Sequence, residues 1–184
     1  MAIHDTTYAI AFQGLSIGNH QFEFSCDSDF LKEMSGGEIE EGDCNVVVNL
    51  EKGANLLNIK CEINGEMSVV CDRCLESFMQ PVEFEGAIFV KFSSEIDEPQ
   101  FDDDLDHETD VLWINPADSY IDLKQYIYES IVLSLPQRRI HPLDENGVSL
   151  CNPDMLERFS VEPDSIDDDA DDENDDDDDG YNFK

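Results

Sequence analysis

The chain has 184 residues and a formal net charge of −35, from 45 acidic and 10 basic side chains. This length allows one domain with tails, and a hydrophobic content of 40% is enough for a core. Nucleic-acid affinity rests on cations that displace counterions from phosphates, so the acidity argues against a protein that coats RNA or DNA broadly. Basic proteins are the natural electrostatic partners, and a role of the charge in solubility alone is the alternative.

No apolar run approaches the roughly 18–20 residues of a membrane span. The start of the chain has no basic region followed by an apolar one, so we expect no secretory signal and a cytoplasmic protein. The six cysteines are then expected in a reducing compartment, where close cysteine pairs bind metal or do redox work more often than they form disulfides.

The first half of the chain predicts mainly strands. Weak alternation over residues 8–26 indicates one or two short strands, and Asp27 can cap a short helix that ends after Met34. From there the pattern becomes β, with one strand that includes residues 46–48 and a second in which the odd-numbered residues of 57–63 are apolar.

The dipeptide Asn64-Gly65 is a hairpin signal. A three-residue or bulged turn would pair Ile63 with Met67 and would put the apolar residues on one face, whereas a two-residue loop would set apolar against polar residues. We therefore expect a three-residue or bulged turn at this dipeptide.

The next strand has the clearest pattern, since the even-numbered residues from Val82 to Phe92 form one apolar face. The segment 93–110 follows with nine acidic residues and no apolar period, and it is predicted to be a solvated, mobile excursion. One strong helix is then predicted from Leu123 to Leu135, where Pro136 ends it.

These elements predict an α+β fold, namely an antiparallel, bent β-sheet of five or more strands covered by one long C-terminal helix. The folded domain is expected to span residues 1–159. The segment 160–184 has thirteen acidic residues and one lysine, and we expect it to be a disordered acidic tail.

Four residues form a candidate metal site. Cys71 and Cys74 lie between two β runs, where a tight turn can direct both sulfurs to one point, and His141 and Cys151 follow the predicted helix. A structural zinc site takes four such ligands, so these residues predict a Cys3His zinc site that ties the strands to the segment after the helix. The alternative is that Cys71 packs in the core and the other three residues are incidental.

A redox role for the Cys-x-x-Cys pair is a further alternative, because such thiols can have a lowered pKa. The thioredoxin arrangement needs this motif at the start of a helix, whereas strands surround it here. The other three cysteines, Cys26, Cys44 and Cys61, have no spaced partner and are expected to be small buried apolar residues.

Three arginines lie close to the candidate site in the sequence. Arg138-Arg139 is the only adjacent basic pair in the chain, just before His141, and Arg73 lies inside the Cys-x-x-Cys motif. If the site forms, these arginines are brought together and can contact RNA phosphate or an acidic partner. The alternative is that they neutralise nearby acids or the end of the helix.

Enzymatic activity is not expected, and neither is a small-molecule substrate. The sequence has no Gly-x-Ser-x-Gly elbow and no glycine-rich phosphate loop, and its carboxylates have no apolar setting that would tune them for catalysis.

Residues 69–76, with the motif Cys71-Asp72-Arg73-Cys74-Leu75, resemble the signature of the YceD family of large ribosomal RNA subunit accumulation proteins. The run Leu133-Ser134-Leu135-Pro136 and the opening Leu15-x-x-Gly18 are also similar to that family, and the resemblance covers roughly residues 8–151. It implies a non-enzymatic role in large-subunit ribosomal RNA accumulation or processing, associated with ribosome assembly and a ribosomal protein.

We therefore expect an accessory factor that binds a precursor of the large ribosomal subunit or a ribosomal protein, with ribosomal RNA contacted through Arg73, Arg138 and Arg139. The first alternative is an acidic holding chaperone for a basic ribosomal protein, which the charge of −35 favours. The second is a redox-active Cys-x-x-Cys protein.

Overall fold

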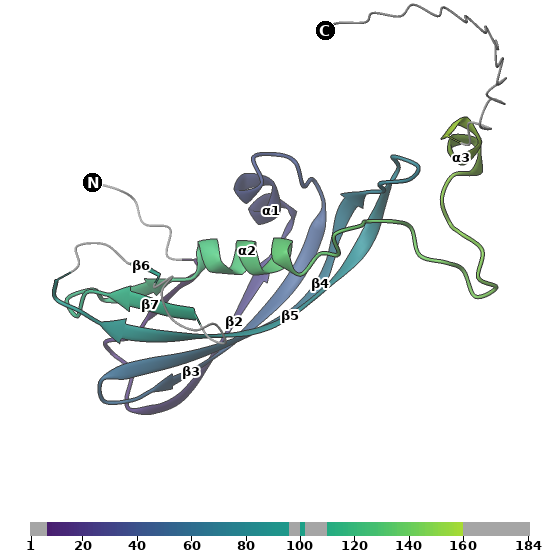
Figure 1. Ribbon diagram of the computed structural model, residues 1–184. Coiled ribbons are helices and arrows are strands. Elements are labelled where there is room, and N and C mark those ends of the chain that lie inside the picture. Colours follow the sequence, from purple (N-terminus) through teal and green to yellow (C-terminus); the bar gives the residue numbers. More distant parts are fainter. Residues whose placement is uncertain (1–6, 96–99, 102–109, 160–184) are drawn as a thin grey trace, which may run out of the picture.

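The computed structural model describes residues 7–95, 100–101 and 110–159, and 46% of these residues lie in strands and 17% in helices. A six-stranded sheet has the order β2-β3-β4-β5-β7-β6, and a two-stranded sheet pairs β1 with β8 (Figure 1). The strands are β1 (Ala9–Ala11), β2 (Gly18–Cys26), β3 (Gly42–Lys52), β4 (Leu56–Val70), β5 (Ser77–Phe92), β6 (Gln100–Phe101), β7 (Asp110–Ile114) and β8 (Tyr120–Asp122). The helices are α1 (Ser28–Met34), α2 (Lys124–Leu133) and α3 (Pro153–Phe159).

Strands β2 to β5 form an antiparallel meander in which each strand pairs with the next along the chain. Alternation buries one face of these strands, as period-2 patterning requires. The apolar face predicted for residues 82–92 is confirmed, since Val82, Ile88 and Val90 are fully buried. The capped helix predicted after Asp27 is also confirmed, because the Asp27 carboxylate accepts a hydrogen bond of 3.0 Å from the N–H of Phe30 in α1.

The predicted fold class, an α+β fold with a purely antiparallel sheet under one long C-terminal helix, is wrong. Strand β7 runs parallel to β5, so the sheet is mixed. The predicted helix 123–135 is the ten-residue α2, and α3 follows it in the chain. A parallel pair requires a crossover connection between its two strands. This connection falls in segment 93–110, whose acidic residues show no strand pattern, so the sequence gives no sign of the parallel pairing.

The predicted hairpin at Asn64-Gly65 is also wrong, because β4 continues straight through it. Gly65 lies opposite Cys44 on β3 and Val82 on β5. A Cβ atom added at Gly65 would lie 2.6 Å from the Cys44 Cα. Glycine is needed here for the close approach of two strands, and the chain turns later, between β4 and β5.

Helix α2 packs one apolar face against the sheet, with Ile127 and Ile131 fully buried and contacts to β5. It contributes to the same core as the buried faces of β2 to β5. Pairing between β3 and β4 begins at Gly42 and Met67, so β4 and β5 continue beyond β3 as a two-stranded ribbon (Figure 1). The turn at the end of this ribbon contains the Cys-x-x-Cys motif.

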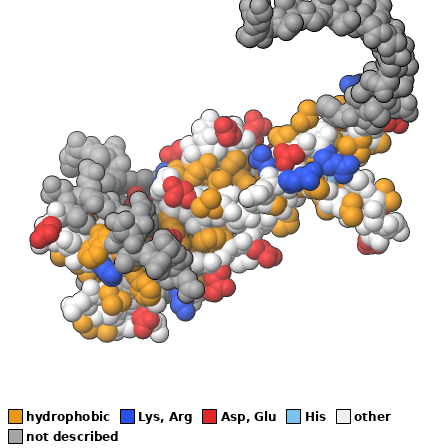
Figure 2. Space-filling model, in the orientation of Figure 1, with side chains coloured by type: hydrophobic (Ala, Val, Ile, Leu, Met, Phe, Trp, Pro, Cys, Tyr) orange, Lys and Arg blue, Asp and Glu red, His pale blue; other side chains and the backbone are white. Residues whose placement is uncertain are grey.

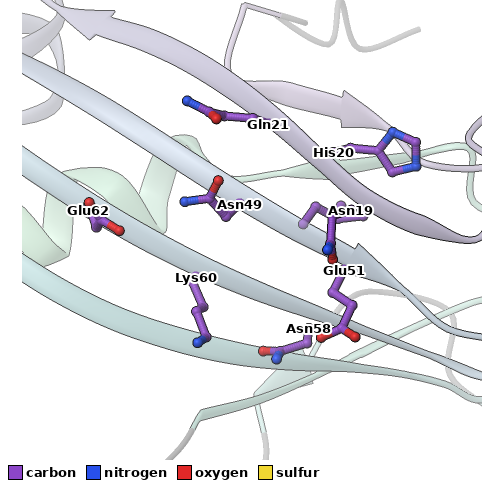
Figure 3. A pocket seen from close by; sticks show the side chains of 9 residues that line it. Asn19, His20, Gln21, Asn49, Glu51, Asn58, Lys60 and Glu62 are labelled. Carbon is purple, nitrogen blue, oxygen red and sulfur yellow. The ribbon is translucent and has the colours of Figure 1, made fainter.

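The outer face of β2, β3 and β4 is polar. It forms an open hollow of about 650 Å³, in which carboxamide side chains stand beside oppositely charged ones (Figure 3). Lys60, Glu51 and Glu62 are examples of the charged residues that line it. This is the pattern of an antiparallel sheet with one face in solvent.

Two of the predicted segments lie outside the described residues. They are most of the acidic excursion 93–110 and the whole acidic tail 160–184. The predicted domain boundary after residue 159 stays a prediction. Among the described residues, no helix is long and apolar enough to cross a membrane.

Candidate metal centre

The turn between β4 and β5 carries the first two predicted ligands. The N–H of Cys71 donates to the carbonyl of Glu76, and the N–H of Leu75 donates to the carbonyl of Cys71, each at 2.9 Å. The N–H of Arg73 points to the Cys71 sulfur at 3.4 Å. These bonds fold the loop tightly, so that the side chains of Cys71 and Cys74 are both buried inside it.

The chain after α2 returns to this turn and is held there by polar anchors. The N–H of Asp72 donates to the carbonyl of Arg139, and the N–H of Arg139 donates to the Asp72 carboxylate, both at 2.7 Å. Further along, the amide of Asn152 donates to the carboxylate of Glu76 at 2.6 Å. Because these residues flank the last two predicted ligands, the anchors bring His141 and Cys151 against the turn.

The four predicted ligands meet at one point. The sulfurs of Cys71, Cys74 and Cys151 and a ring nitrogen of His141 all lie within 4.8 Å of one another. The Cys71 and Cys151 sulfurs are 3.8 Å apart, and the Cys74 sulfur is 3.4 Å from Nδ1 of His141. Two sulfurs bound at about 2.3 Å to one tetrahedral zinc lie about 3.8 Å apart. The donor set and its spacing therefore fit a metal ion.

Apolar side chains surround the four ligands. Phe78 of β5 packs against the His141 ring, with 4.6 Å between the ring centroids and 34° between the ring planes. Met155 and Leu156 of α3 pack against the three buried cysteines in a cluster separate from the main core. An apolar shell limits the access of water to a metal site and fixes the orientation of its ligands.

The two cysteines of the turn have different ionisation. Burial raises the pKa of the Cys71 thiol, but hydrogen bonds from the backbone of Cys74, Arg73 and His141 and from the His141 side chain outweigh burial and bring the pKa from 9.0 to about 6. Burial and the neighbouring sulfurs of Cys71 and Cys151 raise the pKa of Cys74. Metal ligation takes the thiolate form, which the turn already stabilises at Cys71.

The remaining cysteines are structural, as the sequence predicts. Cys26, Cys44 and Cys61 are fully buried in the main core. Burial raises the pKa of these thiols to about 12, about 11 and about 12, respectively. They are neutral apolar packing residues.

The predicted arginines border the metal centre. Arg73, Arg138 and Arg139 are all exposed, and the Arg139 guanidinium lies 3.9 Å from the Asp72 carboxylate. Figure 2 shows basic side chains gathered over the chain between α2 and α3, next to hydrophobic ones. The anchors between residues 72 and 139 thus hold the two arginine-bearing segments side by side.

Comparison with protein families gives a match that includes this site. The family model described as large ribosomal RNA subunit accumulation protein YceD matches residues 59–178. The chain belongs to the YceD family. The YceD match contains the four ligands and the three arginines, whereas the similar opening at Leu15 and Gly18 precedes it. No curated protein and no solved structure matches the chain.

Sequence reasoning missed the residues that assemble this site of the YceD-family chain. Two hydrogen-bonded pairs anchor the segment after α2 to the turn, namely Asp72 with Arg139 and Glu76 with Asn152. The partners in each pair are about as far apart in sequence as the ligands themselves, and no local pattern marks them. The Cys-x-x-Cys motif could have indicated these anchors. When the two cysteines of such a turn face inward, its other residues face outward and can pair with another segment.

Leu75, the residue after the second cysteine, has a left-handed backbone with φ of 63°. Replacing Leu75 by valine is expected to lower the free energy of unfolding by about 1–2 kcal/mol, because a β-branched side chain fits this conformation poorly. Leu75→Gly is the control and is expected to be near neutral, since relief of strain offsets the added freedom of the unfolded chain. Urea unfolding measures both variants, and a valine variant as stable as the glycine one would contradict the role of this conformation.

Proposed function

We propose that the protein is a non-enzymatic accessory factor for large ribosomal subunit biogenesis that binds a precursor of the large subunit or one of its ribosomal proteins. Membership of the YceD family supports this proposal, since the family is described by the accumulation of large ribosomal RNA. The proposed place of action is the cytoplasm, whose reducing conditions keep cysteine ligands available for metal.

The proposed metal is zinc, held by Cys71, Cys74, His141 and Cys151. Three sulfurs and one imidazole nitrogen are a donor set that zinc prefers. A zinc ion with four protein ligands has no open position for a substrate or water, so its chemistry is structural: it cross-links the turn to the chain after α2. This supports a binding protein rather than an enzyme.

The observation that carries the proposed mechanism is the position of the arginines at this cross-link. Arginine suits phosphate contacts because its planar guanidinium donates two parallel hydrogen bonds. The net charge of −35 keeps the rest of the surface away from RNA. Contact with ribosomal RNA is therefore proposed to be local, at Arg73, Arg138 and Arg139.

Sedimentation of cell extracts tests this function. The protein is expected to travel with precursors of the large subunit, and its removal is expected to lower the level of large-subunit ribosomal RNA. If the protein stays at the top of the gradient with a basic ribosomal protein, the holding-chaperone function replaces the proposed one. Absence from precursors, without a bound ribosomal protein and with normal ribosomal RNA, would contradict both functions.

Replacing Arg138 and Arg139 by alanine is expected to lower binding to the precursor particle at least about tenfold, because phosphate contacts supply much of the affinity for RNA. The matched control is Lys32→Ala with Lys60→Ala, which removes the same charge from exposed positions on α1 and β4. The control should bind like the parent protein. Equal binding by the two double variants would show that the arginines do not contact the particle.

A further inference from the structure

A groove with a volume of about 400 Å³ lies beside the β4–β5 ribbon. Its walls are the segment before β3, the end of β4 and the second half of α2. Apolar residues of β4, of α2 and of the chain just after α2 line it, namely Met67, Val69, Tyr128, Val132 and Leu135. Charged side chains also line it, with Glu38 and Glu40 on the first wall and Arg139 near the end of the helix.

One side of β4 is open where it borders this groove. The N–H of Ser68 donates to the carbonyl of Glu41 at 2.8 Å, which continues the β3–β4 ladder by one step. The chain then leaves the strand, and the N–H of Ile39 donates instead to the hydroxyl of Ser35. Between Ser68 and Asp72, whose N–H donates to the carbonyl of Arg139 at 2.7 Å, β4 has no neighbouring strand on this side among the described residues.

The register shows which backbone groups this leaves available. The N–H of Cys71 bonds across to β5, at Glu76, whereas the N–H of Ser68 bonds toward β3. Because backbone groups alternate along a strand, the N–H and C=O of Val70 point to the open side. Val70 is 50% exposed, and no hydrogen bond from these groups is found within the described part of the chain. Such an edge is a template for another strand.

We propose that this groove binds an extended, basic segment of a protein partner, which adds a short strand to β4 at Val70. Main-chain hydrogen bonds to Val70 would give affinity, and the exposed Val132 of α2 would contact an apolar side chain. Glu38 and Glu40 would select lysine or arginine at neighbouring positions.

The charge of the protein favours this occupant over an acidic one. Two carboxylates outnumber the single guanidinium in the groove and the whole chain carries −35, so an acidic segment is repelled. This inference deepens the proposed function and rests on it, because it names the surface that takes a protein partner of the precursor particle. Arg139 lines the groove as well as the metal centre, whereas Arg73 and Arg138 do not line the groove, so RNA contact and strand addition overlap only at Arg139.

Hydrogen exchange of the Val70 amide in the full-length, zinc-loaded protein tests the inference directly. The probe is a short peptide of alternating valine and lysine, and the matched control peptide alternates valine and glutamate. The basic peptide is expected to slow exchange at Val70 at least about tenfold, because the N–H gains a hydrogen-bond partner. The acidic peptide is expected to leave the exchange unchanged.

Two variants separate the contributions of charge and backbone. Glu38→Gln with Glu40→Gln is expected to weaken binding of the basic peptide at least about fivefold and to reduce its salt dependence. Its control is Glu51→Gln with Glu62→Gln on the outer face of the sheet, which should bind normally. Val70→Pro removes the donor on the open edge and is expected to abolish binding with zinc content unchanged.

Three results would overturn the inference: unchanged exchange at Val70 with the basic peptide, equal binding of both peptides, or parent-like binding by Val70→Pro. Any of these leaves co-sedimentation with the precursor intact, because that test depends on the arginines. Conversely, peptide binding at Val70 without co-sedimentation would keep the strand-addition site and reject the ribosomal function.

Discussion

Replacing Cys151 by serine is expected to lower the zinc affinity of the protein at least about a hundredfold, since loss of a thiolate ligand costs more than the 10–100-fold of an outer-shell change. Cys151 lies 3.8 Å from Cys71 in sulfur-to-sulfur distance, and it comes from the segment that the proposed metal would tie to the turn. Competition with a chelator measures the affinity.

The same replacement is expected to loosen the chain after α2. Besides the four candidate ligands, the hydrogen bonds of Asp72 with Arg139 and of Glu76 with Asn152 hold this segment to the turn. The contact of Phe78 with His141 adds to them, and the loss of one ligand weakens the attachment as a whole. Limited proteolysis should therefore cut Cys151→Ser between α2 and α3 at protease concentrations that leave the parent protein intact.

Cys61→Ala is the matched control for Cys151→Ser, because it removes a buried sulfur from the main core. It is expected to keep parent-like zinc affinity while lowering stability by about 1–2 kcal/mol through the small cavity. If Cys151→Ser kept stoichiometric zinc, the four residues would not form the metal centre. Both turn thiols could instead react equally fast with an alkylating agent before and after a chelator is added. That result would argue against bound zinc and in favour of the redox alternative.

Replacing Gly65 by alanine is expected to lower the free energy of unfolding by about 3 kcal/mol, at the upper end for overpacking. An added Cβ would lie 2.6 Å from the Cα of Cys44 and 2.9 Å from its sulfur. A backbone atom cannot move aside as a flexible side chain does, so β3 and β4 would have to separate. Urea unfolding monitored by circular dichroism measures the change.

Gly14→Ala is the matched control, since an added Cβ at Gly14 meets no atom within 4 Å. Its effect on the free energy of unfolding is expected to stay below about 0.5 kcal/mol, as for other surface positions. Equal stability of the two alanine variants would mean that β3 and β4 do not approach as closely as described.

The sequence predicts the strands well where alternation is regular and fails where one signal has two physical causes. Residues 82–92 alternate without interruption and form most of β5. Asn64-Gly65 predicts a turn, yet Gly65 serves a close strand contact, and local sequence does not distinguish the two uses of glycine. The parallel pairing of β7 depends on β5, which is distant in sequence, and no periodicity reports it.

The candidate site is predicted better than the fold that carries it. Metal coordination demands particular residue types, so Cys71, Cys74, His141 and Cys151 could be chosen by chemistry before their positions were known, and the structure brings them together. The open edge at Val70 could not be predicted, because it depends on where β3 begins opposite β4.

The most direct test of the metal centre is X-ray absorption at the zinc edge, with metal content, on full-length protein purified under mild conditions from its own cells. We predict one zinc per chain, with three sulfur neighbours at about 2.3 Å and one nitrogen at about 2.0–2.1 Å. A well-folded protein without bound metal, or zinc surrounded by oxygen and nitrogen only, would contradict the assignment of Cys71, Cys74, His141 and Cys151 as its ligands.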